Sequence, residues 1–287
     1  MTPHVVGTSA GPVEVAETGS GPAVLVVHGT PGDWRQARGL AEDLSVRHRV
    51  LLPSRPGYGR TPLSTGRTPR EQAAAYVALF DALGVDKAAV IGISGGGPSA
   101  RALAAHFRDR CTHLVLCCAV AEHLVTVPVA SRLLAAVPGL WEVGARVGAR
   151  RFRRRLLDRE AVLAGAVADL GPAERAVAAD PQVAADLLTF SESRAHAMTF
   201  VTGMRNDFRW FRAATTGQPW SPGPVLPTLV LHGDADEVVP LSHGENHRDT
   251  IPNARLEVFH GAGHAFMLSM RATTSARIAT FLSGIPL

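Results

Sequence analysis

The fold is decided by one stretch of the chain, Ala89-Val90-Ile91-Gly92-Ile93-Ser94-Gly95-Gly96-Gly97-Pro98. The apolar run before Ser94 is typical of a buried strand, and a helical pattern begins just after the glycines. A serine on so sharp a turn leaves its hydroxyl exposed, and glycines on either side let neighbouring backbones pass closely. The G-x-S-x-G spacing indicates a nucleophilic serine if a base and an acid follow, and otherwise only a glycine-rich loop.

Short apolar runs alternate with helical segments around this stretch, which indicates a mainly parallel sheet covered by helices on both faces. We expect strands at Val13–Glu17, Ala23–His28, Arg49–Leu52, Ala88–Ile93, His113–Cys118, Thr228–His232 and Arg255–Phe259, with a hairpin partner of the first near His4–Thr8. We expect helices at Trp34–Val46, Thr68–Leu83, Pro98–Phe107, Ser242–Thr250 and Arg271–Phe281.

The alternation stops between residues 122 and 218, where the chain is rich in Ala and Arg and keeps a helical spacing. Pro-Gly, Gly-Pro and Asp-Pro pairs divide this segment into short helices. We therefore predict a helical lid, residues 122–218, inserted between the sixth and seventh core strands of a core made of residues 1–121 and 219–287. Such an insertion would lie over the carboxyl ends of the strands, where open α/β sheets bind ligands.

The composition favours one large globular core, because 46% of the 287 residues are hydrophobic and 19% are charged. The chain has neither a run of about 18 apolar residues nor a basic segment followed by an apolar one at its start, so we expect a soluble cytoplasmic protein without membrane insertion. Cys111, Cys117 and Cys118 lie in or beside one apolar run and are interpreted as small core residues.

The net charge of +4 comes largely from an arginine-rich helical segment at residues 146–159. Aromatic residues are scarce there and no nucleic-acid motif accompanies it, so we interpret it as a solvated helix face and expect no nucleic-acid partner. The expected partner is a small-molecule substrate. The sequence does not indicate an oligomeric state.

Two turns downstream of Ser94 carry acid and histidine side chains. The run 229–240 holds Asp234 and Asp236 at the end of one predicted strand, and the run 258–266 holds His260 and His264 at the end of another. A serine hydroxyl becomes a good nucleophile when a histidine takes its proton and a carboxylate orients that histidine. The chain therefore offers the three groups in the order serine, acid, histidine.

This order resembles that of serine enzymes of the α/β-hydrolase fold family. The run His28-Gly29-Thr30-Pro31-Gly32 is similar to the family's H-G-x-P-G loop, and the matching motifs extend from His28 to His264. The run 54–61 is similar to the family's D-x-P-G-x-G-x-S turn, but Ser54 replaces the aspartate and Thr61 the final serine. The resemblance implies an α/β fold with a mostly parallel central sheet flanked by helices.

The resemblance also implies the roles of the catalytic residues. Ser94 would be the nucleophile, His264 the general base and Asp236 the acid that orients it, because Asp236 stands four residues before Pro240, the family's usual spacing. Two other acids stay open for the last role, namely Asp234 and Glu122.

His260 is a weaker alternative for the base, since His264 follows Gly263 in the family's G-H pair. The oxyanion hole would be formed by the backbone amides of Thr30 and Gly95, because Pro31 has no amide to offer. His28 would brace the loop rather than react.

No metal or cofactor is expected. His243 and His247 stand four apart on a predicted helix, as metal ligands can. Gly244, however, occupies the position where a zinc-protease helix needs glutamate, and no third ligand stands out.

Aromatic residues gather in the last part of the insertion, and we predict that they line an apolar substrate pocket: Phe190, Phe208, Trp210 and Phe211. The alternative is that they only pack the lid helices together.

The predicted reaction is hydrolysis of a carboxylic ester, thioester or lactone of a mostly apolar small molecule through an acyl-enzyme on Ser94. Amide cleavage is an alternative, and an aminopeptidase would need Glu192 or Asp207 to hold the substrate amine. Lyase or cyclase chemistry on the same triad and a non-catalytic binding protein are further alternatives. A serine nucleophile disfavours epoxide hydrolases and haloalkane dehalogenases, which need a carboxylate at that position.

Overall fold

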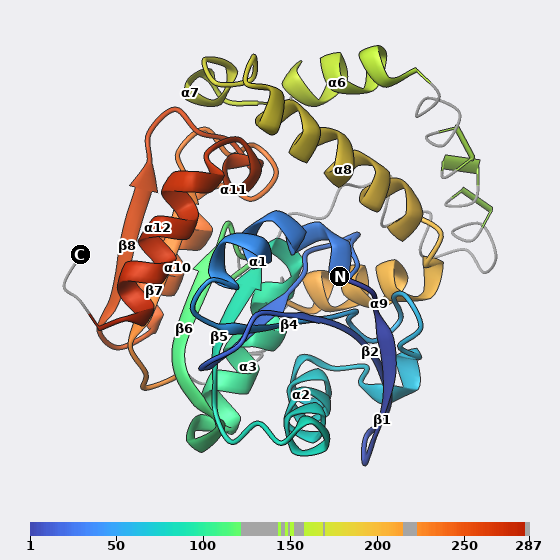
Figure 1. Cartoon of the computed structure of the whole chain (residues 1–287), viewed down its shortest axis with the longest axis vertical. Coiled ribbons are helices and arrows are strands. Elements are labelled where there is room, and N and C mark those ends of the chain that lie inside the picture. The colour runs from blue at the N-terminus through green and yellow to red at the C-terminus, as the bar shows by residue number, and fades with distance from the viewer. Residues whose placement is uncertain are drawn as a thin grey trace.

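A computed structural model describes residues 1–121, 143–144, 147–148, 150–151, 158–168, 170–214 and 223–284. Within these residues the chain forms one eight-stranded sheet in the order β1-β2-β4-β3-β5-β6-β7-β8 (Figure 1). Pairs β1–β2 and β2–β4 are antiparallel, and every other pair is parallel. The strands are β1 (His4–Thr8), β2 (Gly11–Thr18), β3 (Ala23–Val27), β4 (Arg49–Pro53), β5 (Ala88–Ile93), β6 (Cys111–Cys117), β7 (Thr228–Gly233) and β8 (Ala254–Phe259).

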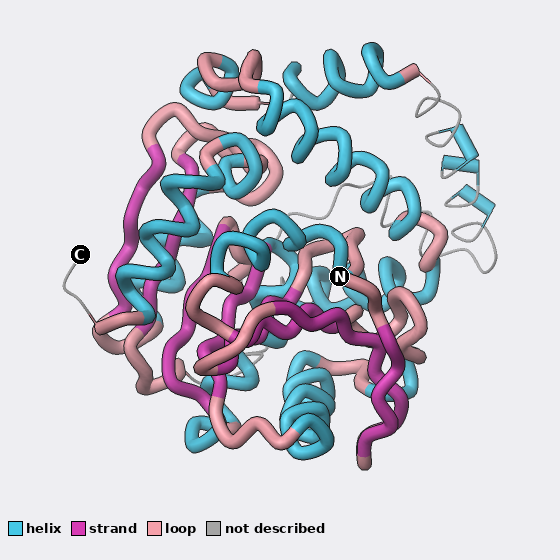
Figure 2. The backbone as a smooth tube through the Cα atoms, in the orientation of Figure 1, coloured by secondary structure: helices cyan, strands magenta, loops and turns pink. Residues whose placement is uncertain are grey.

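Helices cover both faces of this sheet (Figures 1 and 2). One face packs against α1 (Arg38–Leu44) and α12 (Arg271–Leu282). The other packs against α2 (Pro69–Leu83), α3 (Gly97–His106) and α10 (Leu241–Thr250). Shorter turns complete the core: η1 (Trp34–Ala37), η2 (Leu63–Thr65), η3 (Ser94–Gly96), η4 (Arg108–Arg110) and α11 (Phe266–Ser269).

Strand β3 shows why the parallel strands are apolar throughout. Val24 and Val26 pack in the core beneath α1 and α12, whereas Leu25 and Val27 pack in the core beneath α2 and α3. Successive side chains of a strand point to opposite faces, and here both faces are buried. The expected α/β fold class, with its mostly parallel sheet flanked by helices, is confirmed.

Helix α2 illustrates how local sequence signals set element boundaries. The Thr68 side chain accepts a hydrogen bond from the Glu71 backbone N–H, and the Glu71 carboxylate accepts one from the Thr68 backbone N–H, which forms a capping box. Pro69 occupies the first helical position, and Gly84 ends the helix with a left-handed φ of 66°. The helix therefore spans the range that the sequence predicts to within one residue.

Between β6 and β7 the described part of the chain forms only helices: α6 (Arg159–Ala168), α7 (Pro172–Arg175), α8 (Pro181–Ala197) and α9 (Val201–Ala214). The division of the chain into a core and a lid at residues 122 and 218 stays a prediction. Glu122 lies outside the described residues, as do Arg146 and Arg153–Arg155 of the arginine-rich segment. Arg150, Arg151 and Arg159 of that segment are exposed.

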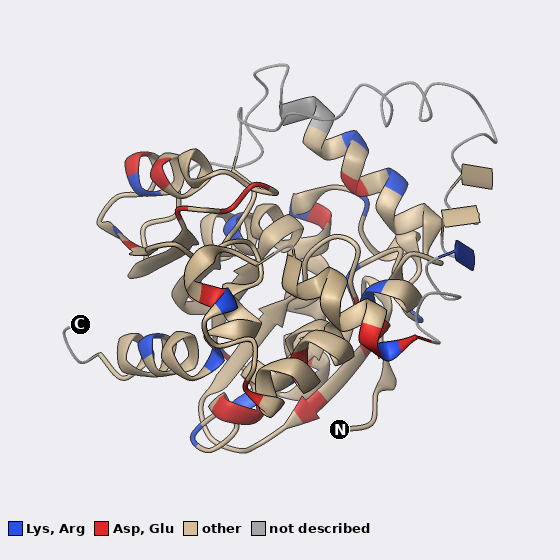
Figure 3. Cartoon of the chain, turned by 90° about the horizontal axis from the view of Figure 1, so that it is seen from above, with Lys and Arg blue, Asp and Glu red and all other residues tan. Residues whose placement is uncertain are grey.

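Acidic and basic residues are interspersed along the described chain, as seen from above in Figure 3. Among the described residues, none of the helices combines the length and apolar character that crossing a membrane would need.

The turn at residues 54–61 is hydrogen-bonded to β2, although Ser54 and Thr61 depart from the family pattern. The Ser54 hydroxyl donates to Glu14 Oε2 at 2.7 Å, and the Thr61 hydroxyl accepts from the Glu14 backbone N–H at 2.9 Å. The hydroxyls of both replacing residues are therefore used to hold this turn.

Candidate active site

Ser94 lies at the tip of a strained turn between β5 and α3. Its φ of 47° is in the left-handed region, which side chains rarely adopt, and such strain clusters at functional sites. A Cβ on Gly92 would come within 2.6 Å of the Ala100 methyl, and one on Gly96 within 2.5 Å of the Val27 carbonyl oxygen. Only glycine lets these backbones approach so closely, so the G-x-S-x-G pattern is a packing requirement of this turn.

Ser94, His264 and Asp236 form one hydrogen-bonded chain at the carboxyl ends of β5, β8 and β7. His264 Nε2 lies 3.1 Å from Ser94 Oγ, and His264 Nδ1 lies 2.7 Å from Asp236 Oδ2. The other carboxylate oxygen of Asp236 accepts the backbone N–H groups of Val238 at 2.9 Å and Val239 at 2.8 Å. The carboxylate is thus held in place, and the imidazole can accept the serine proton.

The alternative acid and base lie on the same two loops but are turned away from Ser94. His260 Nδ1 bonds to Asp234 Oδ2 at 2.9 Å, and the Gly261 N–H donates to Asp234 Oδ1 at 2.6 Å. The His260 side chain is 85% exposed. Neither residue is brought to the serine.

The Asp236 carboxylate sets the electrostatics of His264. Burial alone would lower the pKa of the imidazole, but the neighbouring Cys118 and Asp236 raise that pKa above its ordinary value. Burial raises the pKa of the Cys118 thiol, so the thiol is uncharged at neutral pH and Asp236 supplies the charge. A raised pKa means that the imidazolium formed during proton transfer is stabilised.

Thr30 and Gly95 lie side by side, as the oxyanion-hole prediction requires. A Cβ on Gly95 would overlap the Thr30 hydroxyl. Gly29, one residue before Thr30, lies against Ser94, because a Cβ there would be 2.9 Å from Ser94 Cβ. The Gly29 N–H donates to Gln36 Oε1 at 2.5 Å, which holds this part of the loop.

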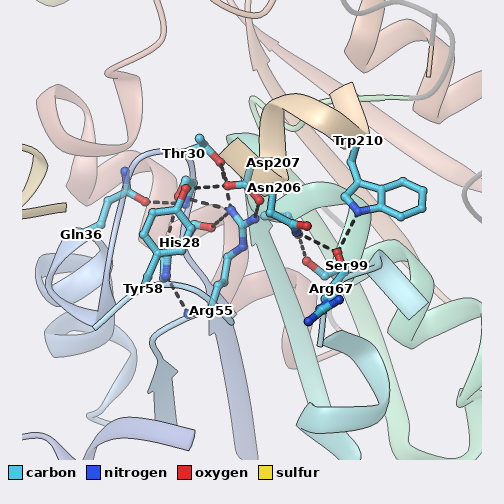
Figure 4. Close-up of polar contacts among 12 residues, drawn as sticks. His28, Thr30, Gln36, Arg55, Tyr58, Arg67, Ser99, Asn206, Asp207 and Trp210 are labelled. Atoms are coloured by element: carbon cyan, nitrogen blue, oxygen red, sulfur yellow. Dashed lines mark hydrogen bonds and ion pairs between the residues drawn. The ribbon is translucent and has the colours of Figure 1, made fainter. Parts of the chain in front are cut away.

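A buried polar network joins this loop to helix α9 (Figure 4). Arg55 Nη2 forms an ion pair with Asp207 Oδ1, and both side chains are at most 4% exposed. Tyr58 Oη donates to Asp207 Oδ2 at 2.7 Å, and the Thr30 hydroxyl donates to the same oxygen at 2.5 Å. Helix α9 therefore contacts the predicted oxyanion loop directly.

His28 braces the loop, as the sequence predicts, and its contacts define its tautomer. The Arg55 backbone N–H donates to His28 Nε2 at 2.9 Å, so the proton is on Nδ1, which donates to the Gly29 carbonyl at 2.8 Å. Burial, and then Arg55, lower the pKa of His28 to about 3. The imidazole is neutral and structural at physiological pH.

Three of the four predicted pocket residues lie near Ser94. Phe208, Trp210 and Phe211 pack with Val120 and Val239, which follow β6 and β7. The Phe211 ring edge would lie 3.0 Å from a Cβ on Gly95. Trp210 Nε1 also donates to the Arg67 carbonyl at 2.7 Å, an anchor visible in Figure 4.

Phe190 lies elsewhere. It lines a cavity of about 240 Å³ between α8 and the η1–α1 segment, whose wall includes Arg35, Gln36 and Leu268. A second cavity, of about 10 Å³, lies beside Gly95 and is lined by Trp210 and Phe211. The aromatic side chains of α9 and that of α8 therefore belong to different spaces.

The two acids that an aminopeptidase would need are unsuited to hold an amine in this arrangement. The charge of Asp207 is already compensated by Arg55. Glu192 is exposed on α8. Amide cleavage at a free amino terminus is disfavoured on this ground.

The histidine pair on α10 has structural contacts. His243 Nδ1 accepts the Ala121 backbone N–H at 3.0 Å. His247 Nδ1 lies 3.4 Å from Arg101 Nη1, whose positive charge opposes a metal cation beside it. Within the described part of the chain, the three side chains grouped closely enough to share a metal are Cys118, Asp236 and His264, and the last two are already bonded to each other.

Sequence reasoning missed Arg55 and Glu174. In the sequence Arg55 stands out only as one residue of the turn at 54–61, and no pattern marks Glu174 as part of the site. Glu174 on α7 is fully buried and accepts the Gly263 N–H at 2.5 Å and the Ser269 hydroxyl at 2.7 Å, which braces the loop carrying His264. Glu174 does carry one local signal, a position three residues after Gly171 at a helix start, but nothing in the sequence names its distant partners.

The model of the α/β-hydrolase fold family matches residues 22–269 of this chain. The uncharacterized hydrolase YcgS of Bacillus subtilis strain 168 is 35% identical over 116 residues, which are 40% of this chain and 41% of that protein. The match therefore spans less than half of that relative. The 2-hydroxymuconate semialdehyde hydrolase of Pseudomonas sp. strain CF600 is 26% identical over 275 residues, which cover 93% of this chain and 89% of the enzyme.

Two solved structures extend the likeness to nearly the whole chain. An α/β hydrolase fold protein from Nakamurella multipartita is 29% identical with a TM-score of 0.79, covering 98% of this chain and 99% of that one. A thermophilic esterase from Thermogutta terrifontis is 25% identical with a TM-score of 0.65, covering 99% of each chain. With the family match over residues 22–269, these likenesses show that the chain belongs to the α/β-hydrolase fold family.

Proposed function

We propose that the chain is a serine hydrolase that cleaves a carboxylic ester, thioester or lactone of a mostly apolar small molecule through an acyl-enzyme on Ser94. One observation carries the proposal: the serine, histidine and aspartate are connected by hydrogen bonds of 3.1 Å and 2.7 Å at the tip of a strained turn. The likeness to the Thermogutta terrifontis esterase supports the same class of reaction.

In the acylation step Ser94 Oγ attacks the carbonyl carbon of the substrate while its proton passes to His264 Nε2. As the new bond forms, the π electron pair of the C=O bond moves onto the carbonyl oxygen and gives a tetrahedral oxyanion; when the C=O bond forms again, the leaving group is expelled. The carbon–oxygen or carbon–sulfur bond breaks, and His264 returns the proton to the leaving group. The Asp236 carboxylate stabilises the transient imidazolium, in accord with the raised pKa of His264.

In the second step water hydrolyses the acyl-enzyme. His264 takes a proton from water, the resulting oxygen nucleophile attacks the acyl carbon, and Ser94 leaves with the proton from His264. In both steps the backbone N–H groups of Thr30 and Gly95 would stabilise the oxyanion, which their adjacent positions support. Phe208, Trp210 and Phe211 would provide the apolar surroundings of the acyl group.

A second candidate is hydrolysis of a carbon–carbon bond beside a carbonyl group on the same triad. The observation that favours it is the likeness to 2-hydroxymuconate semialdehyde hydrolase over 93% of this chain. The substrate in that enzyme's name, 2-hydroxymuconate semialdehyde, carries a carboxylate, and a cationic side chain would help to bind it. Arg55, which lines the small cavity beside Gly95, already forms an ion pair with Asp207. We therefore place ester cleavage first.

The test is labelling with a fluorophosphonate probe followed by peptide mass spectrometry. We expect adduct on the Ser94 peptide of the folded protein, and none in Ser94→Ala, His264→Ala or heat-denatured protein. Folded protein that stays unlabelled would contradict an activated serine and would favour a binding protein or a lyase or cyclase reaction. Turnover of 2-hydroxymuconate semialdehyde with no ester turnover would favour the second candidate.

A panel of p-nitrophenyl esters of increasing acyl length tests the substrate class. Because the Phe211 ring lies against Gly95, Phe211→Ala should shift the preference toward longer acyl chains. Phe190→Ala is the matched control, since Phe190 lines the other cavity. A shift caused by Phe190→Ala alone would move the acyl site to that cavity.

A further inference from the structure

The predicted oxyanion loop is held on one side by the core and on the other by helix α9 of the insertion (Figure 4). The Thr30 hydroxyl donates to Asp207 Oδ2 at 2.5 Å and accepts from Arg55 Nη1 at 3.0 Å. A hydroxyl has one proton to donate, and here that proton is directed to a carboxylate. The side chain of the residue that offers the oxyanion N–H is therefore fixed from both sides.

Asp207 is the centre of this arrangement, although it lies 177 residues from Thr30 in the chain. One carboxylate oxygen accepts from Arg55, and the other accepts from both Thr30 and Tyr58. Burial, and then Asp207, raise the pKa of the Tyr58 phenol well above its ordinary value, so Tyr58 keeps its proton and donates it. Thr30, Arg55 and Tyr58 belong to the predicted core, whereas Asp207 belongs to helix α9 of the predicted insertion.

Arg55 carries the effect along the loop. Its Nη1 lies 3.4 Å from the carbonyl oxygens of both His28 and Gly29, and its backbone N–H bonds to the His28 ring. The charge of Asp207 directs this guanidinium, because a buried cation without its anion would turn toward other acceptors or water. The orientation of three successive loop residues thus depends on one carboxylate of α9.

We propose that Asp207 is a positioning residue: by holding Thr30 and Arg55 it orients the Thr30 N–H toward the oxyanion, so that α9 completes the catalytic site. This inference rests on the function proposed above. Asp207 touches no reacting atom. It acts through the loop, so its loss should reduce stabilisation of the transition state more than it reduces substrate binding.

Asp207→Asn is the principal variant. It keeps the shape but replaces one acceptor oxygen by an NH₂ group, which cannot accept from Thr30, Tyr58 or Arg55. We expect kcat for ester hydrolysis to fall about 10- to 100-fold, less than the 10²- to 10³-fold typical when an oxyanion donor is removed outright, with KM within about twofold. Asn206→Ala is the matched control, because Asn206 anchors α9 to the Arg67 carbonyl at 2.7 Å without contacting Thr30.

Binding of a trifluoromethyl ketone separates positioning from general destabilisation. This inhibitor forms a tetrahedral oxyanion on the serine, so its affinity should fall in Asp207→Asn by the same factor as kcat, while the affinity for the product acid is unchanged. Equal losses of kcat in Asp207→Asn and Asn206→Ala would overturn the inference, as would a change confined to KM.

Thr30→Val removes the hydrogen bond between Thr30 and Asp207 from the Thr30 side. Because this change leaves the Arg55–Asp207 ion pair in place, it tests the inference even if Asp207→Asn does not fold. It should lose kcat to a similar degree, Thr30→Ser should recover most of that loss, and the double variant should lose no more than either single change. An additive double variant would overturn the inference. If the unmodified protein turns over esters and is labelled at Ser94, but Asp207→Asn and Thr30→Val keep full kcat, the positioning role alone is rejected. If Ser94 is not labelled in the unmodified protein, both proposals are rejected.

Discussion

Two aspartate–histidine pairs connect the same two loops, and they differ in almost everything except residue type. The rim pair, Asp234 and His260, has Nδ1 and Oδ2 atoms 2.9 Å apart, and the site pair, Asp236 and His264, has them 2.7 Å apart. The side chains of the rim pair are 35% and 85% exposed, whereas those of the site pair are 0% and 24% exposed. Ser94 contacts only the site pair.

The difference lies in the surroundings of the two histidines, and these surroundings would make His264 rather than His260 the base of the proposed reaction. The site carboxylate accepts two backbone N–H groups and is shielded from water, so its charge acts strongly on the imidazole. The rim carboxylate faces solvent, which screens its charge. Four sets of variants and conditions test this contrast.

The largest effect is expected from removing the two histidines in turn. His264→Ala should lower kcat for ester hydrolysis by about 10⁶-fold, as removal of a catalytic base does in serine hydrolases. His260→Ala should leave kcat within about twofold. Steady-state kinetics with one p-nitrophenyl ester measures both, and a loss of similar size in the two variants would show that the rim pair takes part in catalysis.

The two acids should differ by nearly as much. Asp236→Asn should lower kcat about 10⁴-fold, because an amide can hold the wrong tautomer of His264 and cannot stabilise the imidazolium. Asp234→Asn should leave kcat nearly unchanged. If Asp236→Asn were fully active, the acid would have to come from elsewhere, and residue 122 would be the next to replace.

Buried histidines outside the site should make the fold sensitive to acid, in contrast to the exposed rim histidine. Burial, followed by the charges of Arg55 and Arg101 respectively, lowers the pKa of His28 and of His247 to about 3. Above pH 6.5 both are neutral in the folded and unfolded states. Below that, the unfolded state binds protons that the folded state does not, so each histidine should lower the unfolding free energy by about 1.4 kcal/mol per pH unit, down to about pH 3.

Urea denaturation at pH 7.5 and pH 5 measures this loss. His247→Gln should reduce the difference between the two pH values. A free energy of unfolding that stays constant between these pH values would contradict the burial of neutral imidazoles.

The smallest effect is expected from the rim pair itself. Hydrogen bonds from His260 and then Gly261 lower the pKa of Asp234, so the pair stabilises the fold above the unfolded pKa and loses this contribution as the pH falls. Asp234→Asn should lower the melting temperature by no more than about 2 °C at low salt, because exposed pairs contribute little. The effect should shrink further in 0.5 M NaCl, and a salt-independent loss would show that the hydrogen bond to Gly261 matters more than charge.

Much of the sheet and the turn at Ser94 could be predicted because their signals are local. Apolar runs identify β3, β5, β6 and β7, and the capping box and the terminal glycine mark the ends of α2. The G-x-S-x-G pattern identifies the strained turn for the same reason, since Gly92 lies against Ala100 of the helix that follows it, although the close contact of Gly96 is with Val27 of β3. Local geometry leaves little freedom at such positions.

The partners of charged residues in the insertion could not be predicted in the same way. Asp207 was considered as an anchor for a substrate amine, yet it pairs with Arg55, which is 152 residues away. Glu174 reaches Gly263 across 89 residues. A carboxylate on a helix is compatible with solvent, substrate or a buried partner, and only the packing of that helix against the core selects among them.

The sequence by itself determined the α/β alternation, the position of Ser94 and the set of acids and histidines that could serve it, because strand periodicity and turn chemistry are properties of neighbouring residues. The family resemblance favoured the Asp236–His264 pair, but only the tertiary structure shows that this pair reaches Ser94 and that α9 holds the loop at Thr30. Those outcomes depend on the direction in which a side chain leaves its loop and on whether water is excluded from it, and distant segments set both.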